Sequence, residues 1–124
     1  MVSVTKLQKI NNAKGDLYKI FRSLTEDQEI CEVYISEIHS GEEKGWKYHE
    51  KMGCMIFVIQ GSVEFSFKDG KNIEKKLISS DDYLLLEIPK NTWFSFKGCD
   101  YKTSRIVNFA NIWHSSDPGI SVPL

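Results

Sequence analysis

Short strand-like runs, separated by turn residues, recur along most of this 124-residue chain and constrain its fold more than any other feature. They are bounded by glycine, proline, aspartate or asparagine, and they lie at 17–22, 30–38, 55–60, 62–68, 73–77, 83–88, 92–96 and 104–110. Short strands with turn signals about 8–12 residues apart predict an all-β sandwich or barrel. No stretch has sustained helical periodicity, and only 23–27 is compatible with a single short helical turn.

Two of these runs carry patterns that place them within the fold. Val63, Phe65 and Phe67 alternate with polar residues, which predicts a strand with one face turned to the core. The run 55–59 is apolar on both faces, as is typical of a strand buried between layers or at a subunit contact. The dipeptide Asp69-Gly70 predicts a tight hairpin, because glycine tolerates the positive φ angles of such turns.

Composition and charge are those of an ordinary globular chain with no nucleic-acid surface. Apolar residues make up 41% and charged residues 27%, which excludes disordered and fibrous classes. The 16 basic residues nearly balance the 17 acidic ones, so no basic surface attracts nucleic acid or an anionic membrane. The N-terminus has no apolar signal segment, and no run approaches the ~20 apolar residues of a membrane helix. We expect a single cytoplasmic domain over residues 1–124.

Cys31, Cys54 and Cys99 form no C-x-x-C pair. An odd number of cysteines without a secretory segment predicts free reduced thiols, two or three of them partly buried. Cys54 has no base beside it in the sequence, so a buried, inert thiol is expected there instead of a nucleophile.

The segment 44–52, Lys-Gly-Trp-Lys-Tyr-His-Glu-Lys-Met, is the densest in chemically active side chains. As a strand, it places Lys47 and His49 on one face, with Trp46 and Tyr48 on the other. Lysine is rarely buried without a partner, so the first face either meets water or lines a polar cavity. A metal site is not expected, because the chain has 3 histidines and no H-x-H pair, and the Lys47 ammonium would repel a metal ion.

Two tryptophans and one arginine are further candidates for ligand contacts. Trp46 and Trp93 are able to stack on a nucleobase or a sugar face, although aromatic residues more often fill a core. Arg105 lies in an otherwise apolar run; it suits a pyrophosphate if it points inward, and an outward position is equally compatible with the pattern. No glycine-rich phosphate loop precedes a helix, so Rossmann and P-loop folds have no support.

Three segments of the chain carry a more specific pattern. They are 41–49 followed by Gln60-Gly61-Ser62 and Asp69-Gly70, the proline turn and strand at 88–94, and the closing segment 108–117. Together they resemble the nucleotide-sugar cupins, the group of dTDP-4-dehydrorhamnose 3,5-epimerases and dTDP-4-keto-6-deoxyglucose 3,4-ketoisomerases, from about Gly15 to the end. The resemblance implies a cupin jelly-roll barrel, usually a homodimer, that binds a nucleoside-diphosphate 4-keto sugar without a metal or other cofactor.

Several positions depart from the pattern of these enzymes. The ketoisomerases carry an H-x-H pair on the pocket strand; here its second histidine is His49 and its first is replaced by Lys47. The first of these positions holds the base of the 3,5-epimerases, so that base is missing. The epimerase lysine corresponds to Cys54, and the epimerase acid tyrosine falls near Val107, with no tyrosine close by. Phe94 stands where metal cupins carry their last histidine.

The sequence therefore predicts a nucleotide-sugar isomerase or epimerase of surface-glycan biosynthesis, with a non-catalytic sugar-nucleotide or glycan-binding cupin as the alternative. A 4-keto group acidifies the neighbouring C–H, so catalysis needs a base, an acid and a donor for the enolate oxygen. His49 is the candidate base or acid, Lys47 the enolate donor and Tyr34 a proton relay. The candidate substrate-binding residues are Lys44, Trp46, Trp93, Arg105 and Asn108. The expected ligand is a dTDP-sugar.

Overall fold

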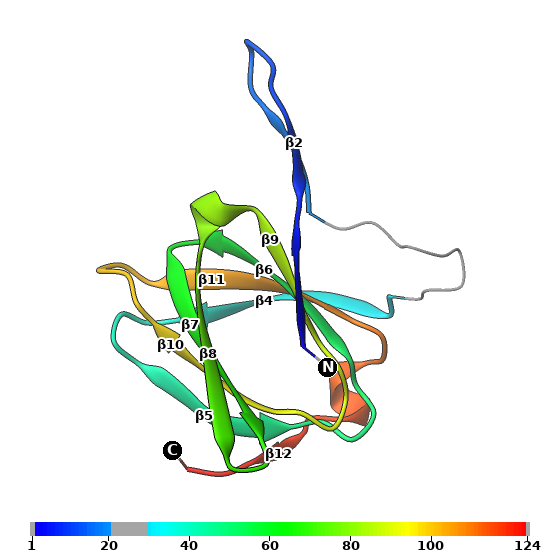
Figure 1. Cartoon of the computed structure of the whole chain (residues 1–124). Coiled ribbons are helices and arrows are strands. Elements are labelled where there is room, and N and C mark those ends of the chain that lie inside the picture. The colour runs from blue at the N-terminus through cyan, green and yellow to red at the C-terminus, as the bar shows by residue number, and fades with distance from the viewer. Residues whose placement is uncertain (1, 21–29, 124) are drawn as a thin grey trace.

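Two antiparallel five-stranded sheets make up most of the computed structural model, which describes residues 2–20 and 30–123. The first sheet has the order β1-β9-β6-β11-β4, formed by Ser3–Lys6, Leu84–Ile88, Cys54–Gln60, Ser104–Ala110 and Glu32–Ile38. The second has the order β12-β5-β10-β7-β8, formed by Ile120–Ser121, Glu43–Tyr48, Trp93–Gly98, Ser62–Asp69 and Asn72–Ser79. The sheets pack face to face as a jelly roll, which confirms the predicted fold class (Figure 1).

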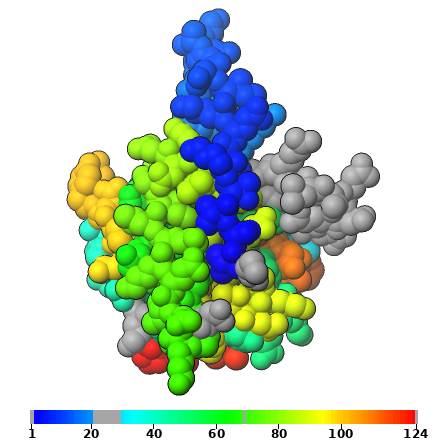
Figure 2. Space-filling view, viewed as in Figure 1, coloured from blue at the N-terminus to red at the C-terminus, as the bar shows by residue number. Residues whose placement is uncertain are grey.

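A two-stranded hairpin lies outside the two sheets. Its strands are β2 (Gln8–Ile10) and β3 (Leu17–Lys19), and it projects from one end of the molecule (Figures 1 and 2). Tyr18 of this hairpin stacks on Tyr83 with ring centroids 5.2 Å apart, which ties the hairpin to the start of β9.

Helical structure among the described residues consists of two short 3-10 turns, η1 (Ser80–Asp82) and η2 (His114–Ser116). The short helical turn that was compatible with 23–27 lies outside the described residues, as does the end of the run at 17–22. Across 2–20 and 30–123, no helix has the length and apolar character needed to cross a membrane.

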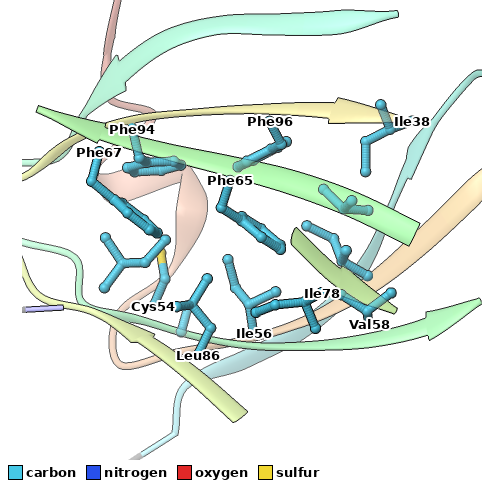
Figure 3. Packing of buried hydrophobic residues seen from close by; sticks show 14 of the residues in the cluster. Ile38, Cys54, Ile56, Val58, Phe65, Phe67, Ile78, Leu86, Phe94 and Phe96 are labelled. Carbon is cyan, nitrogen blue, oxygen red and sulfur yellow. The ribbon is translucent and has the colours of Figure 1, made fainter. Parts of the chain in front are cut away.

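The core lies between the two sheets. Four phenylalanines of the second sheet face small and branched apolar residues of the first: Phe65, Phe67, Phe94 and Phe96 against Cys54, Ile56, Val58 and Leu86 (Figure 3). Val63 and Phe65 are 0% exposed and Phe67 is 4% exposed, which confirms the predicted alternation of β7. The β7–β8 hairpin turns at Gly70 with φ 61°, as the Asp-Gly dipeptide predicts.

The first sheet buries apolar side chains on its outer face as well. This second cluster consists of Met55, Phe57, Leu85, Val107 and Phe109, with Leu7, Ile20 and Ile30 packed against it. Strand β6 therefore contributes to both clusters, which explains why 55–59 is apolar on both sides. Val33 and Ile35 of the edge strand β4 pair with Phe109 and Val107 and are 54% and 59% exposed. We call these two residues and the second cluster together the outer apolar face.

The three cysteines are free, and only Cys54 is buried, whereas Cys31 and Cys99 are exposed. The expectation that two or three thiols would be partly buried is therefore wrong. Cys31 precedes β4 and Cys99 follows β10, so both lie at the ends of strands, where the facing sheet does not cover them.

Candidate functional site

A cavity of about 160 Å³ lies between the sheets, at the strands β4, β5, β10 and β11. Its polar lining consists of Tyr34, Ser36, Lys47, His49, Asn108 and His114. The fold therefore brings together four of the residues expected to form a site, namely Tyr34, Lys47, His49 and Asn108. Of the two interpretations left open for the Lys47 face, the polar cavity is the one that the structure shows.

A bulge in strand β5 brings a second lysine to the inner face. The register of β5 with β10 pairs Lys47 with Phe94 and Lys44 with Phe96, and it shifts between these two pairs. Both phenylalanines belong to the core, so both lysines lie on the core side of β5, although strict alternation would place Lys44 on the opposite side. Lys44 Nζ donates to Ser36 Oγ at 2.8 Å. Burial lowers the pKa of Lys44, and the neighbouring charge of Lys47 acts in the same direction.

His49 follows β5, and its ring is held between the core and the C-terminal segment. Nδ1 lies 3.1 Å from the backbone oxygen of Asp117, and the ring stacks on Phe94 with centroids 5.9 Å apart. A neutral imidazole that donates Nδ1–H to a carbonyl keeps the lone pair on Nε2, so Nε2 is the basic atom. Burial holds the pKa of His49 below its ordinary value; Asp117 opposes this shift, while Lys47 and His114 add to it. Burial is thus the largest cause of the lowered pKa of His49, and the Lys47 charge adds to it.

The C-terminal segment is fastened to the barrel around this ring. Asp117 Oδ2 accepts the backbone N–H groups of Lys51 and Met52, each at 2.9 Å, and lies 3.8 Å from His49 Nδ1. The pKa of Asp117 lies below its ordinary value, and the hydrogen bond from the Lys51 N–H is the largest cause of this shift. Strand β12 then pairs with β5. Asp117 and β12 therefore hold the C-terminal segment against the barrel.

Asn108 and Tyr34 form the opposite part of the lining. Asn108 Nδ2 donates to the Tyr34 hydroxyl at 2.9 Å, and Asn108 Oδ1 is buried without a hydrogen-bond partner among the described residues. Burial raises the pKa of Tyr34 well above its ordinary value, so the phenol keeps its proton at neutral pH and acts as a donor. Burial also raises the pKa of the Cys54 thiol, which agrees with an inert thiol.

The two tryptophans are not part of this cavity. Trp46 lies on the other face of β5, where Lys68 Nζ is 4.4 Å from its ring centroid. Trp93 packs against Tyr48, with ring centroids 5.0 Å apart. The structure therefore does not bring Trp46 and Trp93 to a ligand held beside His49.

Arg105 is also outside the cavity. Its side chain is exposed, and Nε lies 3.0 Å from Oε2 of Glu37 on the neighbouring strand β4. The next residue, Ile106, is 1% exposed and faces the core, so Arg105 faces away from it. The outward alternative for Arg105 is the one observed.

Two residues of the closing segment belong to the site but were not among the expected site residues. His114, in η2, stands edge-on to the His49 ring with centroids 6.5 Å apart, and Asp117 positions that ring. In the sequence, His114 is one of 3 histidines, and no local pattern assigns it a role. The sequence signal for His114 and Asp117 is that the closing segment 108–117 resembles the nucleotide-sugar cupins. That resemblance marks the whole segment and does not indicate which of its side chains turn inward.

Within 2–20 and 30–123, no three His, Cys, Asp or Glu side chains lie close enough together to hold a metal ion. Phe94, at the position where metal cupins carry a histidine, instead packs against the His49 ring. That the site works without a metal ion stays a prediction, which a measurement of the metal content of the protein would test.

Sequence comparison identifies one family. The family described as FdtA: WxcM-like, C-terminal, matches residues 1–118 of the chain. No curated protein sequence is significantly similar to this chain.

Several solved structures share the fold at low sequence identity. The dTDP sugar isomerase from Desulfovibrio desulfuricans G20 superposes with a TM-score of 0.85 at 23% identity, over 98% of this chain and 83% of that chain. The WlaRB TDP-quinovose 3,4-ketoisomerase from Campylobacter jejuni gives 0.83 at 22%, over 98% and 92%. The 3,5-epimerase RmlC from Legionella pneumophila, solved with dTDP-4-keto-L-rhamnose, gives 0.81 at 15%, over 98% and 72%.

Proposed function

Because the chain belongs to the FdtA (WxcM-like, C-terminal) family, we propose that it isomerises a nucleoside-diphosphate 4-keto-6-deoxy sugar by proton transfer, as a 3,4-ketoisomerase does. The observation that carries the proposal is the cavity in which the buried imidazole of His49 lies beside the Lys47 ammonium and the Tyr34 phenol. Proteins of the same fold include a dTDP sugar isomerase and a 3,4-ketoisomerase, which agrees with this substrate class.

Each of these three groups matches a requirement of the reaction. Nε2 of His49 takes the proton from C3, which the 4-keto group acidifies. Negative charge then develops on the oxygen at C4, where the Lys47 ammonium and the Tyr34 hydroxyl supply a charge and a hydrogen bond. The C4 oxygen then takes up a proton, the C3 hydroxyl loses one, and return of the carbon-bound proton at C4 gives the 3-keto sugar.

The cavity also limits which part of the ligand enters it. At about 160 Å³ it is smaller than the ~300–1,000 Å³ of pockets that enclose whole drug-sized ligands, so the sugar ring enters and the nucleotide lies outside. The buried Oδ1 of Asn108 is an acceptor for a sugar hydroxyl. Lys44 and Lys47 place two positive charges on the β5 side of the cavity for an anionic ligand or intermediate.

The test is incubation with dTDP-4-keto-6-deoxyglucose in D₂O, followed by NMR. Deuterium at C3 of the remaining substrate and at C4 of a 3-keto product supports ketoisomerisation, whereas deuterium at C3 and C5 of a 4-keto sugar indicates epimerisation. If dTDP raises the melting temperature but no exchange occurs, the non-catalytic binding alternative is correct. Ligand at 100 times Kd stabilises the native state by about 2.7 kcal/mol, which a thermal shift detects readily. No shift with dTDP, UDP or GDP would contradict both functions.

Variants at the two neighbouring β5 positions test the assigned roles. His49→Asn should lower turnover by about 10²–10⁴-fold with little change in ligand affinity, the usual loss when a positioned base is removed. Lys47→Met should lower turnover and also weaken binding. The matched control is His39→Asn, since the His39 ring is exposed and bonds Thr103 Oγ1 at 3.0 Å. Full activity of both His49→Asn and Lys47→Met would refute the assignment.

A further inference from the structure

We propose that His114 is a second catalytic residue of this site, and that it moves the hydroxyl proton while His49 moves the carbon-bound proton. The inference rests on the proposed isomerase function and names a residue that the resemblance to known enzymes does not assign. Three observations carry it: the proton balance of the reaction, the placement of His114, and the properties of the other groups that line the cavity.

Conversion of a 4-keto to a 3-keto sugar moves two protons. The C3–H bond breaks, its proton goes to His49 Nε2, and its electron pair forms C3=C4 while the C4 carbonyl oxygen becomes an oxyanion. A proton added to that oxygen gives the enediol. Removal of the proton from the C3 hydroxyl then forms the C3 carbonyl, and the electron pair of C3=C4 takes the proton back from His49 at C4. The reaction neither gains nor loses protons overall. The group that protonates the C4 oxygen and deprotonates the C3 hydroxyl must therefore both donate and accept a proton.

The placement of His114 fits this second role. It lines the same cavity as His49, and the two rings stand edge to face with centroids 6.5 Å apart. Two imidazoles at this spacing address adjacent positions of one sugar ring, where reacting atoms need approach distances of about 3–3.5 Å. The backbone N–H of His114 donates to Glu32 Oε1 at 2.8 Å, which anchors η2 to β4.

The His114 ring has no competing polar partner in the part of the chain that the structure describes. Across 2–20 and 30–123, neither of its nitrogens makes a hydrogen bond, and its ring contacts are with Tyr34, at 5.6 Å between centroids, and with His49. By contrast, His49 Nδ1 is already engaged with the Asp117 carbonyl. Both nitrogens of His114 are therefore available to a ligand.

The other polar groups of the cavity are less suited to moving a proton between the C3 and C4 oxygens. Burial raises the pKa of Tyr34, so its phenol is a weak acid that hydrogen-bonds the oxyanion without giving up its proton at neutral pH. Lys47 is needed as a fixed positive charge beside the oxyanion, and the Asn108 amide does not titrate. A neutral imidazole carries one donor and one acceptor nitrogen, so it gives a proton at one atom and takes one at the other. His114 is the group of this cavity that meets both requirements.

The experiment compares two rates in one D₂O reaction with dTDP-4-keto-6-deoxyglucose: deuterium uptake at C3 and formation of the 3-keto sugar. For His114→Asn we expect C3 exchange within about threefold of the parent rate, since His49 is intact, and product formation lowered by about 10²-fold. His49→Asn should lose both, and His39→Asn neither. Imidazole added to His114→Ala should restore product formation, which a purely structural role would not allow.

Two outcomes for the variants would overturn the proposal. One is product formation by His114→Asn at the parent rate, which would show that His49 or water moves both protons. The other is an equal loss of exchange and product formation in His114→Asn and His114→Ala without imidazole rescue, which would make His114 a structural residue. Failure of the proposed function is distinct from both, since the parent protein itself would then show neither exchange nor product.

Discussion

Gly119 packs directly against the His49 ring, and its replacement by alanine tests whether the C-terminal segment positions that ring. Gly119 has φ +86°, and a Cβ there would lie 2.8 Å from His49 Cε1 and 3.0 Å from Nδ1. Carbon atoms in contact need about 3.5 Å, so the ring or the segment must move by about 0.7 Å. Such a shift lengthens the hydrogen bond between Nδ1 and the Asp117 carbonyl.

The two consequences of Gly119→Ala have separate magnitudes. A left-handed conformation costs a non-glycine residue about 1–2 kcal/mol, which should appear as a lower free energy of unfolding. A displacement approaching 1 Å at a reacting group costs up to about 10²-fold in rate, so deuterium uptake at C3 should fall by about 10- to 100-fold. Urea unfolding measures the first quantity and NMR the second.

Gly41→Ala is the matched control. Gly41 has φ +75°, and no atom lies within 4 Å of a Cβ built there. It carries the same backbone cost of about 1–2 kcal/mol without the collision with His49. If Gly119→Ala keeps the parent exchange rate and loses no more stability than Gly41→Ala, the C-terminal segment does not set the position of the ring, and the reasoning fails.

Two further predictions concern the pH dependence of stability and the assembly of the chain. Burial holds the pKa of His49, which faces Lys47, His114 and Asp117, below its ordinary value, so the unfolded chain takes up the proton first. Stability should therefore fall as the pH drops below about 6.5. His49→Asn should flatten this slope, and an unchanged slope in urea unfolding would contradict the prediction. Light scattering should show a homodimer formed through the outer apolar face. Val33→Glu should dissociate it, whereas Ile73→Glu should not, since Ile73 is 53% exposed on β8 of the other sheet; a monomeric parent at high micromolar concentration would refute the dimer.

Most strands could be predicted because their signals are local, whereas β1, β2 and β12 were not among the predicted runs. Val63, Phe65 and Phe67 alternate along a few residues, and the turn at Gly70 follows from a dipeptide. The inner position of Lys44 could not be predicted in the same way. It depends on a bulge against β10, and a shift of register is fixed by the partner strand, not by the sequence of β5 itself.

The residues of the site also fall into those that a local sequence pattern predicts and those that it does not. Lys47 and His49 share a face because they are two residues apart on one extended segment, so their pairing follows from the sequence pattern. The Asp117 carbonyl that bonds His49 lies 68 residues further along the chain. Which residues of the closing segment reach the cavity is decided by how η2 and β12 pack on β5, and no local pattern encodes that contact. The alternation of 44–52 already placed Trp46 opposite His49. The residue types of Trp93 and Arg105 suit ligand contacts, but they do not fix the side of the sheet on which the side chains lie.

The central position of β11 in the first sheet has a consequence for synthesis of the chain. β11 lies between β6 and β4, both of which precede it in the sequence. A ribosome adding about 5–20 residues per second takes about 2.5–10 s to proceed from the end of β6 to the end of β11. During that time β4 and β6 have no strand between them, and their unpaired N–H and C=O groups lie beside the apolar side chains of 55–59. The nascent chain is therefore most prone to aggregate in these seconds, before residue 110 is available to close the sheet.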